Sequence, residues 1–309
     1  MDKIVILTGP TAVGKTELSI KLAKSINGEI ISADSIQVYK KLDIGSAKIT
    51  KEEMQGVKHY LVDVLDPKED FNVYIFKEMA NDAISEILNK KKTPIIVGGT
   101  GFYIQSVIND IDFNEEDNSA VRKELEEIAN EKGNIYLHNE LKKIDKESAD
   151  KIHPNNVKRV IRAIEFYKLN NKPISQHNEE ESTKKAVYNA KYFVLNDKRE
   201  LLYERINKRV DKMIELGLVK EVKELVDSGL DSSYNSMQGI GYKEILEYIN
   251  GECTLENAIL NIKKNTRHFA KRQLTWFRRE KNVNWIDKDK YNYDEERILS
   301  ELIEIYKND

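Results

Sequence analysis

The chain has 309 residues, with 50 Lys and Arg against 53 Asp and Glu, so its formal net charge is −3 at pH 7. A hydrophobic fraction of 40% with only 14 Gly and 5 Pro excludes a disordered or low-complexity chain. No apolar run reaches the ~18 residues of a membrane span, and no signal-peptide cleavage pattern follows the first apolar run. The single cysteine, Cys253, excludes an internal disulfide or a zinc framework. We therefore expect a cytoplasmic, monomeric protein without membrane contact, long enough for two domains.

Strand-like and helix-like patterns alternate in the first third of the chain. Short apolar runs rich in β-branched residues predict strands at Ile4–Thr8, Glu29–Ser32, Tyr60–Val64 and Pro94–Val97. Amphipathic stretches such as FKEMANDAISEILNKK lie between them. This alternation favours an α/β domain with a mostly parallel sheet.

The pattern changes after Asn109. Residues 119–180 are charged and helix-patterned, without strand-like runs. Lys191–Leu195 predicts one more strand, and the remainder reads as largely helical. Three glycines stand where helices should end, namely Gly217, Gly229 and Gly251.

A phosphate-binding loop motif follows the first predicted strand. The segment GPTAVGKT matches G-x-x-x-x-G-K-[ST] between a strand and a helix. Its backbone N–H groups and the helix N-terminus suit phosphate oxygens, the lysine supplies a charge, and the threonine hydroxyl can bind Mg²⁺. The motif consists of Gly9, Pro10, Thr11, Ala12, Val13, Gly14, Lys15 and Thr16. The loop predicts that a polyphosphate binds, but it does not distinguish a nucleotide from another diphosphate.

These patterns together predict a P-loop α/β core with a mostly parallel sheet flanked by helices, plus an inserted all-helical domain. We expect the core to comprise residues 1–112 and 186–309, and the insertion to comprise residues 113–185.

Two further segments follow predicted strands at the edge where ligands bind in open α/β sheets. Asp34 comes after the second strand, and its carboxylate could hold a metal, accept a proton or cap a helix. Thr100, in the segment GGTG, follows the fourth strand. That segment is either a tight turn or a place where a hydroxyl meets substrate phosphates.

At this point the motifs resemble one family. GPTAVGKT, SADSIQVYK, DIGSAK, VGGTGFYIQ, HPNNVKRVIRAIE, GIGYKE and TRHFAKRQLTWFRR, in this order, resemble the tRNA dimethylallyltransferases, also called tRNA isopentenyltransferases. The resemblance runs from Gly9 to Arg279, in the bacterial form without a C-terminal zinc finger. Ile36 stands where the family usually has Arg, which puts one polar RNA contact in doubt, and Ile49 where it usually has Pro.

The resemblance implies transfer of a dimethylallyl group from dimethylallyl diphosphate to N6 of adenosine 37, in the anticodon stem-loop of tRNAs that read codons starting with U. It assigns the catalytic roles to Asp34 as base, with Thr100 and Arg209 near the reacting groups. It assigns Mg²⁺ to Thr16 and the diphosphate to the loop Gly9–Thr16. It implies tRNA contacts by Asp34, Ser35, Ile36, Gln37, Thr100, Arg122, Lys158, Arg159, Val160, Ile161, Arg162, Gln238, Gly239, Ile240, Gly241, Tyr242, Lys243, Lys271, Arg272, Gln273, Trp276 and Arg278.

The charge distribution is compatible with RNA binding despite the balanced total. Asn109–Glu131 contains nine acidic and two basic residues, whereas Lys263–Arg279 contains seven Lys or Arg, one His and no acid. Phe269, Trp276 and Phe277 lie among these charges and could stack on bases. The alternative for such a run is a solvated helix face, and the alternative for Arg209 is an exposed helix charge.

Two other functions remain open from the residues alone. A small-molecule or nucleoside kinase would use the same loop on ATP, and a non-catalytic RNA-binding NTPase would also need a loop and a basic surface. A kinase does not need the basic aromatic helix, and an RNA-binding switch does not need Asp34 at a strand end.

Overall fold

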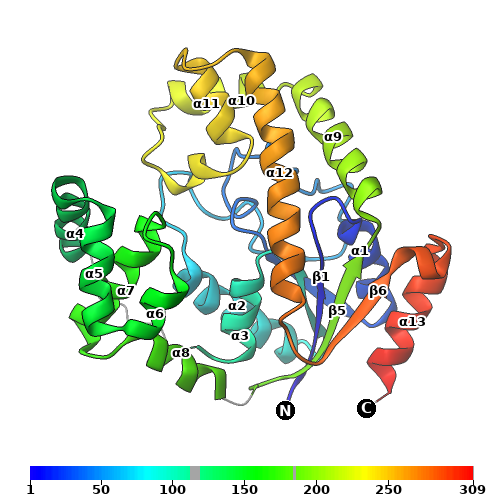
Figure 1. Cartoon of the computed structure of the whole chain (residues 1–309). Helices are drawn as coiled ribbons and strands as arrows, with labels where there is room; N and C mark the ends of the chain where they lie inside the picture. Colours follow the sequence, from blue (N-terminus) through cyan, green and yellow to red (C-terminus); the bar gives the residue numbers. More distant parts are fainter. Residues whose placement is uncertain (112–118, 184–185, 309) are drawn as a thin grey trace. The chain divides into compact units, whose positions relative to one another are not determined.

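The computed structural model describes residues 1–111, 119–183 and 186–308 (Figure 1). The chain divides into two compact units. Unit 1 comprises Met1–Ile108 and Val187–Asp309, and unit 2 comprises Asn109–Ala186. The domain boundaries expected at residues 112–113 and 185 lie outside the described residues.

Unit 1 is built on a six-stranded sheet in which every pair of neighbours is parallel. The strands are β1 (Lys3–Thr8), β2 (Gly28–Ala33), β3 (His59–Tyr60), β4 (Thr93–Gly98), β5 (Asn189–Asn196) and β6 (Val283–Asp287), in the order β3-β2-β4-β1-β5-β6. The predicted α/β class with a mostly parallel sheet is confirmed. Because a parallel sheet is covered on both faces, its central strands are continuous apolar runs.

Two strands differ from the prediction. Of the stretch Tyr60–Val64, only Tyr60 belongs to β3, because Leu61 and Asp63 have positive φ angles of 60° and 59° that end the strand. The strand β6 was not predicted, since its sequence VNWID has no continuous apolar run. It forms because β5 offers an edge, pairing Val194 with Trp285.

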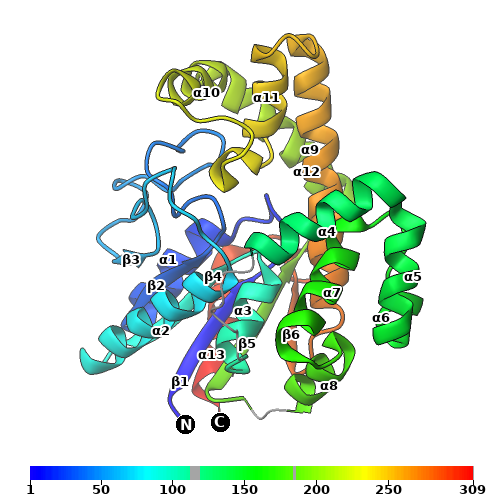
Figure 2. The ribbon, with the colours of Figure 1, turned by 90° about the vertical axis from the view of Figure 1, so that its left-hand side faces the viewer.

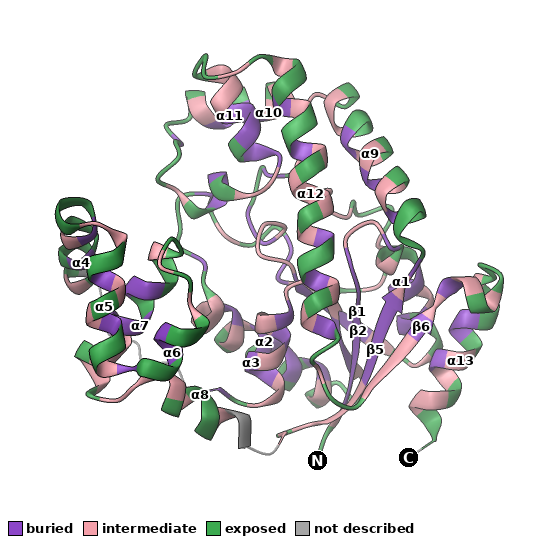
Figure 3. Cartoon of the chain, in the orientation of Figure 1, coloured by how far each residue is buried: buried purple, intermediate pink, exposed green. Residues whose placement is uncertain are grey.

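Alternate residues of the strands enter separate cores on the two faces of the sheet. Ile4 and Ile6 pack with α2 (Val73–Asn89) and α3 (Gly101–Ile108), whereas Val5 and Leu7 pack with α1 (Lys15–Ser25) and α13 (Glu295–Lys307). Figure 2 shows α2 and α3 on one side of the strands, and Figure 3 shows the burial of β1, which is buried after its first residue, and of β5, which is buried from Tyr192 to Leu195. The sheet therefore gives the loops at its carboxyl edge a rigid base.

The remaining helices of unit 1 follow β5. They are α9 (Arg199–Glu215), α10 (Leu218–Asp227), α11 (Tyr242–Ile249) and the long α12 (Leu255–Phe277), with the 3₁₀ turns η1 (Asn235–Gln238) and η2 (Lys288–Tyr291). The glycines expected to end three of these helices do so. Gly217, Gly229 and Gly251 have positive φ angles of 100°, 88° and 77°, which suit glycine.

The described regular structure of unit 2 is helical. It consists of α4 (Ser119–Lys132), α5 (Asn134–Ile144), α6 (Lys146–Lys151), α7 (Val157–Asn170) and α8 (Ile174–Thr183). Its core gathers Leu125, Leu137, Leu141 and the inner face of α7. Val160 and Ile161 belong to that face and are almost fully buried. The apolar period of α7 turns their side chains inward, and their tRNA contacts stay a prediction.

In the part of the chain that the structure describes, no helix has both the length and the apolar character needed to cross a membrane.

Candidate active site

The loop Gly9–Thr16 joins β1 to α1 in a conformation that only its glycines allow. Gly14 has a φ of 96°, and a Cβ on Gly9 would collide with the backbone oxygen of Leu195 in β5. The side chain of Lys15 folds back over the loop. Its Nζ donates hydrogen bonds to the backbone oxygens of Gly9 and Pro10, each at 2.9 Å. These two hydrogen bonds fix the Lys15 ammonium group next to the backbone of the loop.

The Lys15 ammonium is electrostatically unusual. Burial, together with the positive charge of Arg209, lowers its pKa to about 7, while Asp34 acts in the opposite direction. Burial also lowers the pKa of the Arg209 guanidinium, again opposed by Asp34. Two desolvated cations that face one carboxylate form a site that a further anion would stabilise.

Asp34 follows the last residue of β2 and uses its two oxygens differently. Its Oδ1 accepts hydrogen bonds from the backbone N–H groups of Ile36 at 2.9 Å and Gln37 at 3.2 Å. Among the described residues, Oδ2 has no hydrogen-bond donor. The capping role and a chemical role are therefore compatible, because one oxygen fixes the carboxylate while the other is left for a ligand.

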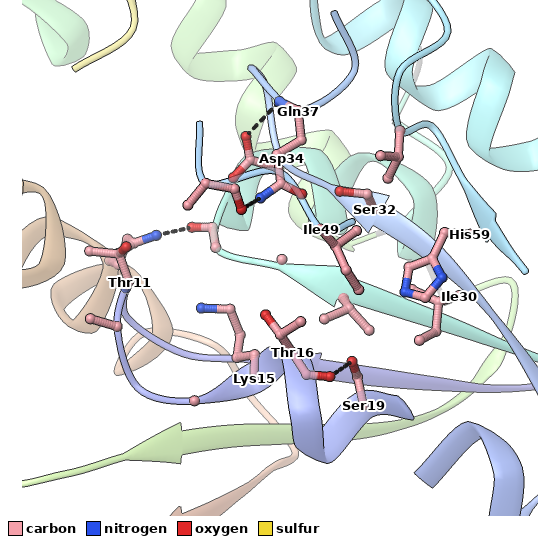
Figure 4. A pocket seen from close by; sticks show the side chains of 18 of the residues that line it. Thr11, Lys15, Thr16, Ser19, Ile30, Ser32, Asp34, Gln37, Ile49 and His59 are labelled. Carbon is pink, nitrogen blue, oxygen red and sulfur yellow. Dashed lines mark hydrogen bonds between the residues drawn. The ribbon is translucent and has the colours of Figure 1, made fainter. Parts of the chain in front are cut away.

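A first cavity of about 370 Å³ lies over the phosphate loop (Figure 4). Lys15 and Thr16 lie on one wall, and Asp34 lies on the opposite wall. Among the described lining residues Asp34 is the only acid, whereas the basic residues are Lys15, Arg205 and Arg209. Because Arg205 is paired with Asp197, the cavity offers two uncompensated cations, Lys15 and Arg209, against one carboxylate, which suits an anionic ligand.

A second cavity of about 580 Å³ shares Asp34 and Arg209 with the first. Thr100, at the start of α3, lines this second cavity and not the first. The shared wall consists of Thr11, Asp34, Gly99, Arg209, Phe269 and Gln273. Apolar side chains such as Ile206 and Met213 line much of the rest. The arrangement offers a phosphate compartment and a larger, more apolar compartment that meet at one carboxylate and one guanidinium.

Gln273 of α12 connects the phosphate loop to the loop after β4. Its Oε1 accepts a hydrogen bond from Thr11 N at 2.9 Å, and its Nε2 donates one to Gly99 O at 3.0 Å. A Cβ on Gly99 would overlap this amide and would push it out of its present position. Both ends of the buried amide are engaged within the protein. The assignment of Gln273 as a direct tRNA contact is therefore not supported by its position.

The aromatic residues expected to stack on RNA are largely turned inward. Phe277 is 0% exposed and belongs to the core, so its predicted stacking role is wrong. Trp276 is half-buried and packs against Phe102 with ring centroids 6.1 Å apart, above Gly101. Phe269 lines both cavities beneath the guanidinium of Arg272, 5.8 Å from its ring centroid.

Only some of the basic side chains on α12 are available to bind a ligand, because others are paired within the protein. Lys263 forms an ion pair with Asp211 of α9 at 2.5 Å, and Arg267 donates to Asn207 at 2.6 Å. Lys271, Arg272 and Arg278 are exposed. The C-terminal half of α12 therefore carries the charge available to a polyanion.

The segment Gln238–Lys243 divides between surface and core. Gln238 and Lys243 are exposed, while Gly239 and Ile240 are half-buried. Tyr242 is 0% exposed, and its hydroxyl donates to Glu221 Oε1 at 2.7 Å. Gly241 and Tyr242 are therefore both buried in this structure, and their tRNA contacts stay a prediction.

The loop after Asp34 is held in place from within. Gln37 donates through Nε2 to the backbone oxygens of Ser46 and Ala47, both at 3.2 Å. Ser35 and Ile36 are half-buried beside it and line the second cavity. Ile36, at the position where the family usually has Arg, packs against Gly239.

In unit 2 the expected basic residues are on the surface. Lys158, Arg159 and Arg162 are exposed on α7, opposite its buried face. Arg122 of α4 forms an ion pair at 2.8 Å with Glu165, whose side chain is buried. Arg122 therefore already has one carboxylate partner on α7.

Sequence reasoning missed Arg205 as a site residue. It lies one helical turn before Arg209, lines the first cavity and pairs with the buried Asp197. The spacing of four residues places the two side chains on one face of a helix and could have indicated it. His59 also lines the first cavity.

Similarity to known proteins extends over nearly the whole chain. A family model described as IPP transferase matches residues 37–280. The chain is 61% identical over 306 residues to the tRNA dimethylallyltransferase of Lachnoclostridium phytofermentans, covering 99% of this chain and 97% of that protein. This chain belongs to the tRNA dimethylallyltransferase family. A second member, from Acetivibrio thermocellus, is 54% identical over 299 residues and covers 96% of each chain.

Solved structures of this transferase family have the same fold. The tRNA delta(2)-isopentenylpyrophosphate transferase of Staphylococcus epidermidis is 44% identical, covers 100% of both chains and superposes with a TM-score of 0.74. A eukaryotic dimethylallyltransferase acting on tRNA is 30% identical, with a TM-score of 0.78, and covers 93% of this chain and 74% of that one. Membership of this family does not favour the kinase alternative.

Proposed function

We propose that this transferase moves the dimethylallyl group of dimethylallyl diphosphate to N6 of adenosine 37 in the anticodon loop of tRNA, and releases diphosphate. The observation that supports this most directly is the shared wall of the two cavities. The first cavity has the charge for a diphosphate, and the second has the volume and the apolar lining for a base. Asp34 and Arg209 stand where the reacting atoms of two such ligands would meet.

The exocyclic N6 is a weak nucleophile because its lone pair is delocalised into the ring. As the bond from N6 to C1 of the allyl group forms, N6 must lose a proton. We assign that proton to Asp34 Oδ2, the oxygen that no described donor occupies. The hydrogen bonds to Oδ1 fix the carboxylate plane, so the acceptor is oriented before the substrates arrive.

The bond from C1 to the diphosphate oxygen breaks in the same step, and the electron pair leaves with the diphosphate. The loop N–H groups, Lys15 and Arg209 would neutralise this charge. Thr100 lines the second cavity and not the first, so it would contact the adenosine and not the diphosphate.

We propose Mg²⁺ as the metal that assists this leaving group by neutralising diphosphate charge. Thr16 is exposed at the start of α1 and lines the first cavity. Within the described ranges, no group of three or more His, Cys, Asp or Glu could hold a metal by itself. The donor set therefore fits an ion that is held by Thr16, the diphosphate and water, as Mg²⁺ commonly is.

For tRNA, the surface residues that support binding lie on both units. In unit 1 they are Gln238, Lys243, Lys271, Arg272 and Arg278, and in unit 2 they are Arg122, Lys158, Arg159 and Arg162. Their contribution is chiefly to phosphate contacts, which carry most of the affinity. Residues of a single chain line both cavities, so we expect a monomer to be active.

One assay tests the proposal against its alternatives. Unmodified tRNA, Mg²⁺ and the protein are incubated with dimethylallyl diphosphate or with ATP. We expect a mass gain on the tRNA that maps to adenosine 37, and no ATP hydrolysis. ATP turnover without RNA modification would support a kinase or an RNA-binding NTPase and would contradict the proposal.

A further inference from the structure

Lys288 is a buried lysine behind the phosphate loop. It opens η2 directly after β6 and is only 8% exposed. Its Nζ donates a long hydrogen bond of 3.4 Å to the backbone oxygen of Val13. A Cβ placed on Gly14 would lie 3.2 Å from the same Nζ. The ammonium group therefore lies directly against the Val13–Gly14 peptide, although Lys288 is 273 residues away from Lys15 in sequence.

In the described part of the chain, no counterion balances the ammonium group of Lys288. Among the described residues, no carboxylate forms an ion pair with Lys288. The carboxylates of two aspartates near this edge of the sheet bind other side chains. Asp287 binds Lys290 at 2.8 Å and Asn196 at 2.9 Å, and Asp197 binds Arg205. A buried cation with one weak acceptor is costly to the folded protein, and an anion held on the loop would offset that cost.

The position of the ammonium also orients the loop. In a planar trans peptide the C=O and the following N–H point to opposite sides. Because the Val13 carbonyl points toward the Lys288 ammonium group, the Gly14 N–H points away from it. Gly14 lines the first cavity, where the proposed diphosphate binds. The contact thus fixes one of the donors that the loop offers to a phosphate.

We propose that Lys288 is a positioning residue for the diphosphate, which holds the Val13–Gly14 peptide in its phosphate-binding orientation and adds a positive charge behind the loop. The inference rests on the proposed diphosphate site and extends it to a residue outside the GPTAVGKT motif. It predicts an effect on diphosphate affinity that is independent of tRNA affinity.

The test compares two neighbouring lysines of η2. Lys288→Met removes the buried charge at similar volume, and Lys290→Met removes the same charge from an exposed side chain, 73% accessible. Calorimetry gives the Kd of pyrophosphate with Mg²⁺, and kinetics give the KM for dimethylallyl diphosphate and for tRNA. We expect Lys288→Met to weaken pyrophosphate binding and raise the diphosphate KM about tenfold, as loss of one charge-assisted contact would. The KM for tRNA should stay the same, Lys290→Met should resemble the unmodified protein, and Lys288→Arg should restore most of the affinity.

Two outcomes would overturn the inference. A lower Tm for Lys288→Met with unchanged pyrophosphate Kd would make Lys288 a packing residue. Equal weakening by Lys290→Met would attribute the effect to net charge. Should Lys288→Met fail to fold, Lys288→Gln allows the same comparison. Pyrophosphate binding without tRNA modification by the unmodified protein would contradict the proposed function, yet the comparison of the two lysines would still decide the role of Lys288.

Discussion

Gln273 on the basic helix α12 accepts a hydrogen bond from the backbone N–H of Thr11 in the phosphate loop, at 2.9 Å. The same amide donates to Gly99 at 3.0 Å, beside Thr100. One side chain therefore joins the helix that carries Lys271 and Arg272 to both loops that line the site. This makes α12 a structural support of both loops as well as the carrier of part of the proposed tRNA surface.

Replacing Gln273 with Met should damage both stability and diphosphate binding. The substitution leaves two backbone groups without their partner, at about 1–3 kcal/mol for each group that stays buried and unsatisfied. We expect a lower Tm and a higher KM for dimethylallyl diphosphate. Thr275→Ala, which removes an exposed hydroxyl from the same helix, is the control. An unchanged Tm and KM in Gln273→Met would show that the bridge is dispensable.

Diphosphate binding should take up a proton at Lys15. In the free protein its pKa is lowered to about 7 by burial and by Arg209, so at pH 8 the side chain is mostly neutral. A bound diphosphate favours the charged form and raises this pKa, so affinity should fall as pH rises above about 7. Calorimetry of pyrophosphate binding at pH 8, in buffers of different ionisation enthalpy, measures the uptake. We expect Lys15→Met to take up fewer protons than the unmodified protein, and equal uptake by both would contradict this assignment.

The exposed part of α12 should set the salt dependence of tRNA binding. Each phosphate that a Lys or Arg neutralises releases counterions, which steepens the log–log dependence of affinity on salt by somewhat under one unit. Replacing Lys271 and Arg272 together with Ala should flatten this slope by roughly one to two units. The matched control is Lys263→Ala with Lys264→Ala, since Lys263 is already paired with Asp211. If the slope is unchanged by the first pair, the C-terminal half of α12 does not contact tRNA phosphates.

The sequence predicted those parts of the site whose positions depend on residues adjacent to them in the chain. The loop Gly9–Thr16 needs glycine at fixed positions after a buried strand, and Asp34 follows the next strand directly, so both could be recognised from spacing. The roles of Gln273 and Tyr242 could not be, because both are decided by contacts with segments far away in sequence. Gln273 meets Thr11 across 262 residues, and Tyr242 meets Ser46 across 196.

The same distinction explains why some residues of the basic stretches on α7 and α12 are buried. A run of basic residues predicts a charged helix face, but a helix turns every third or fourth residue inward. Val160 and Ile161 lie within the basic stretch of α7 and still belong to the core, as does Phe277 at the end of α12. The strand β6 was missed for a related reason, since pairing with β5 compensates for its polar sequence.

The proton acceptor is the central claim, and Asp34→Asn tests it most directly. Asn keeps the shape and the acceptor oxygen that caps Ile36 and Gln37, so thermal stability should hardly change. It lacks the basic oxygen, so the single-turnover rate of tRNA prenylation at saturating substrates should fall about 10²–10⁴-fold. Affinities for tRNA and diphosphate should change far less. The measurement is this rate across a magnesium series, with thermal melts alongside. A rate near that of the unmodified protein would contradict the assignment of Asp34 as the base, and recovery of the rate at high magnesium would make it a metal ligand instead.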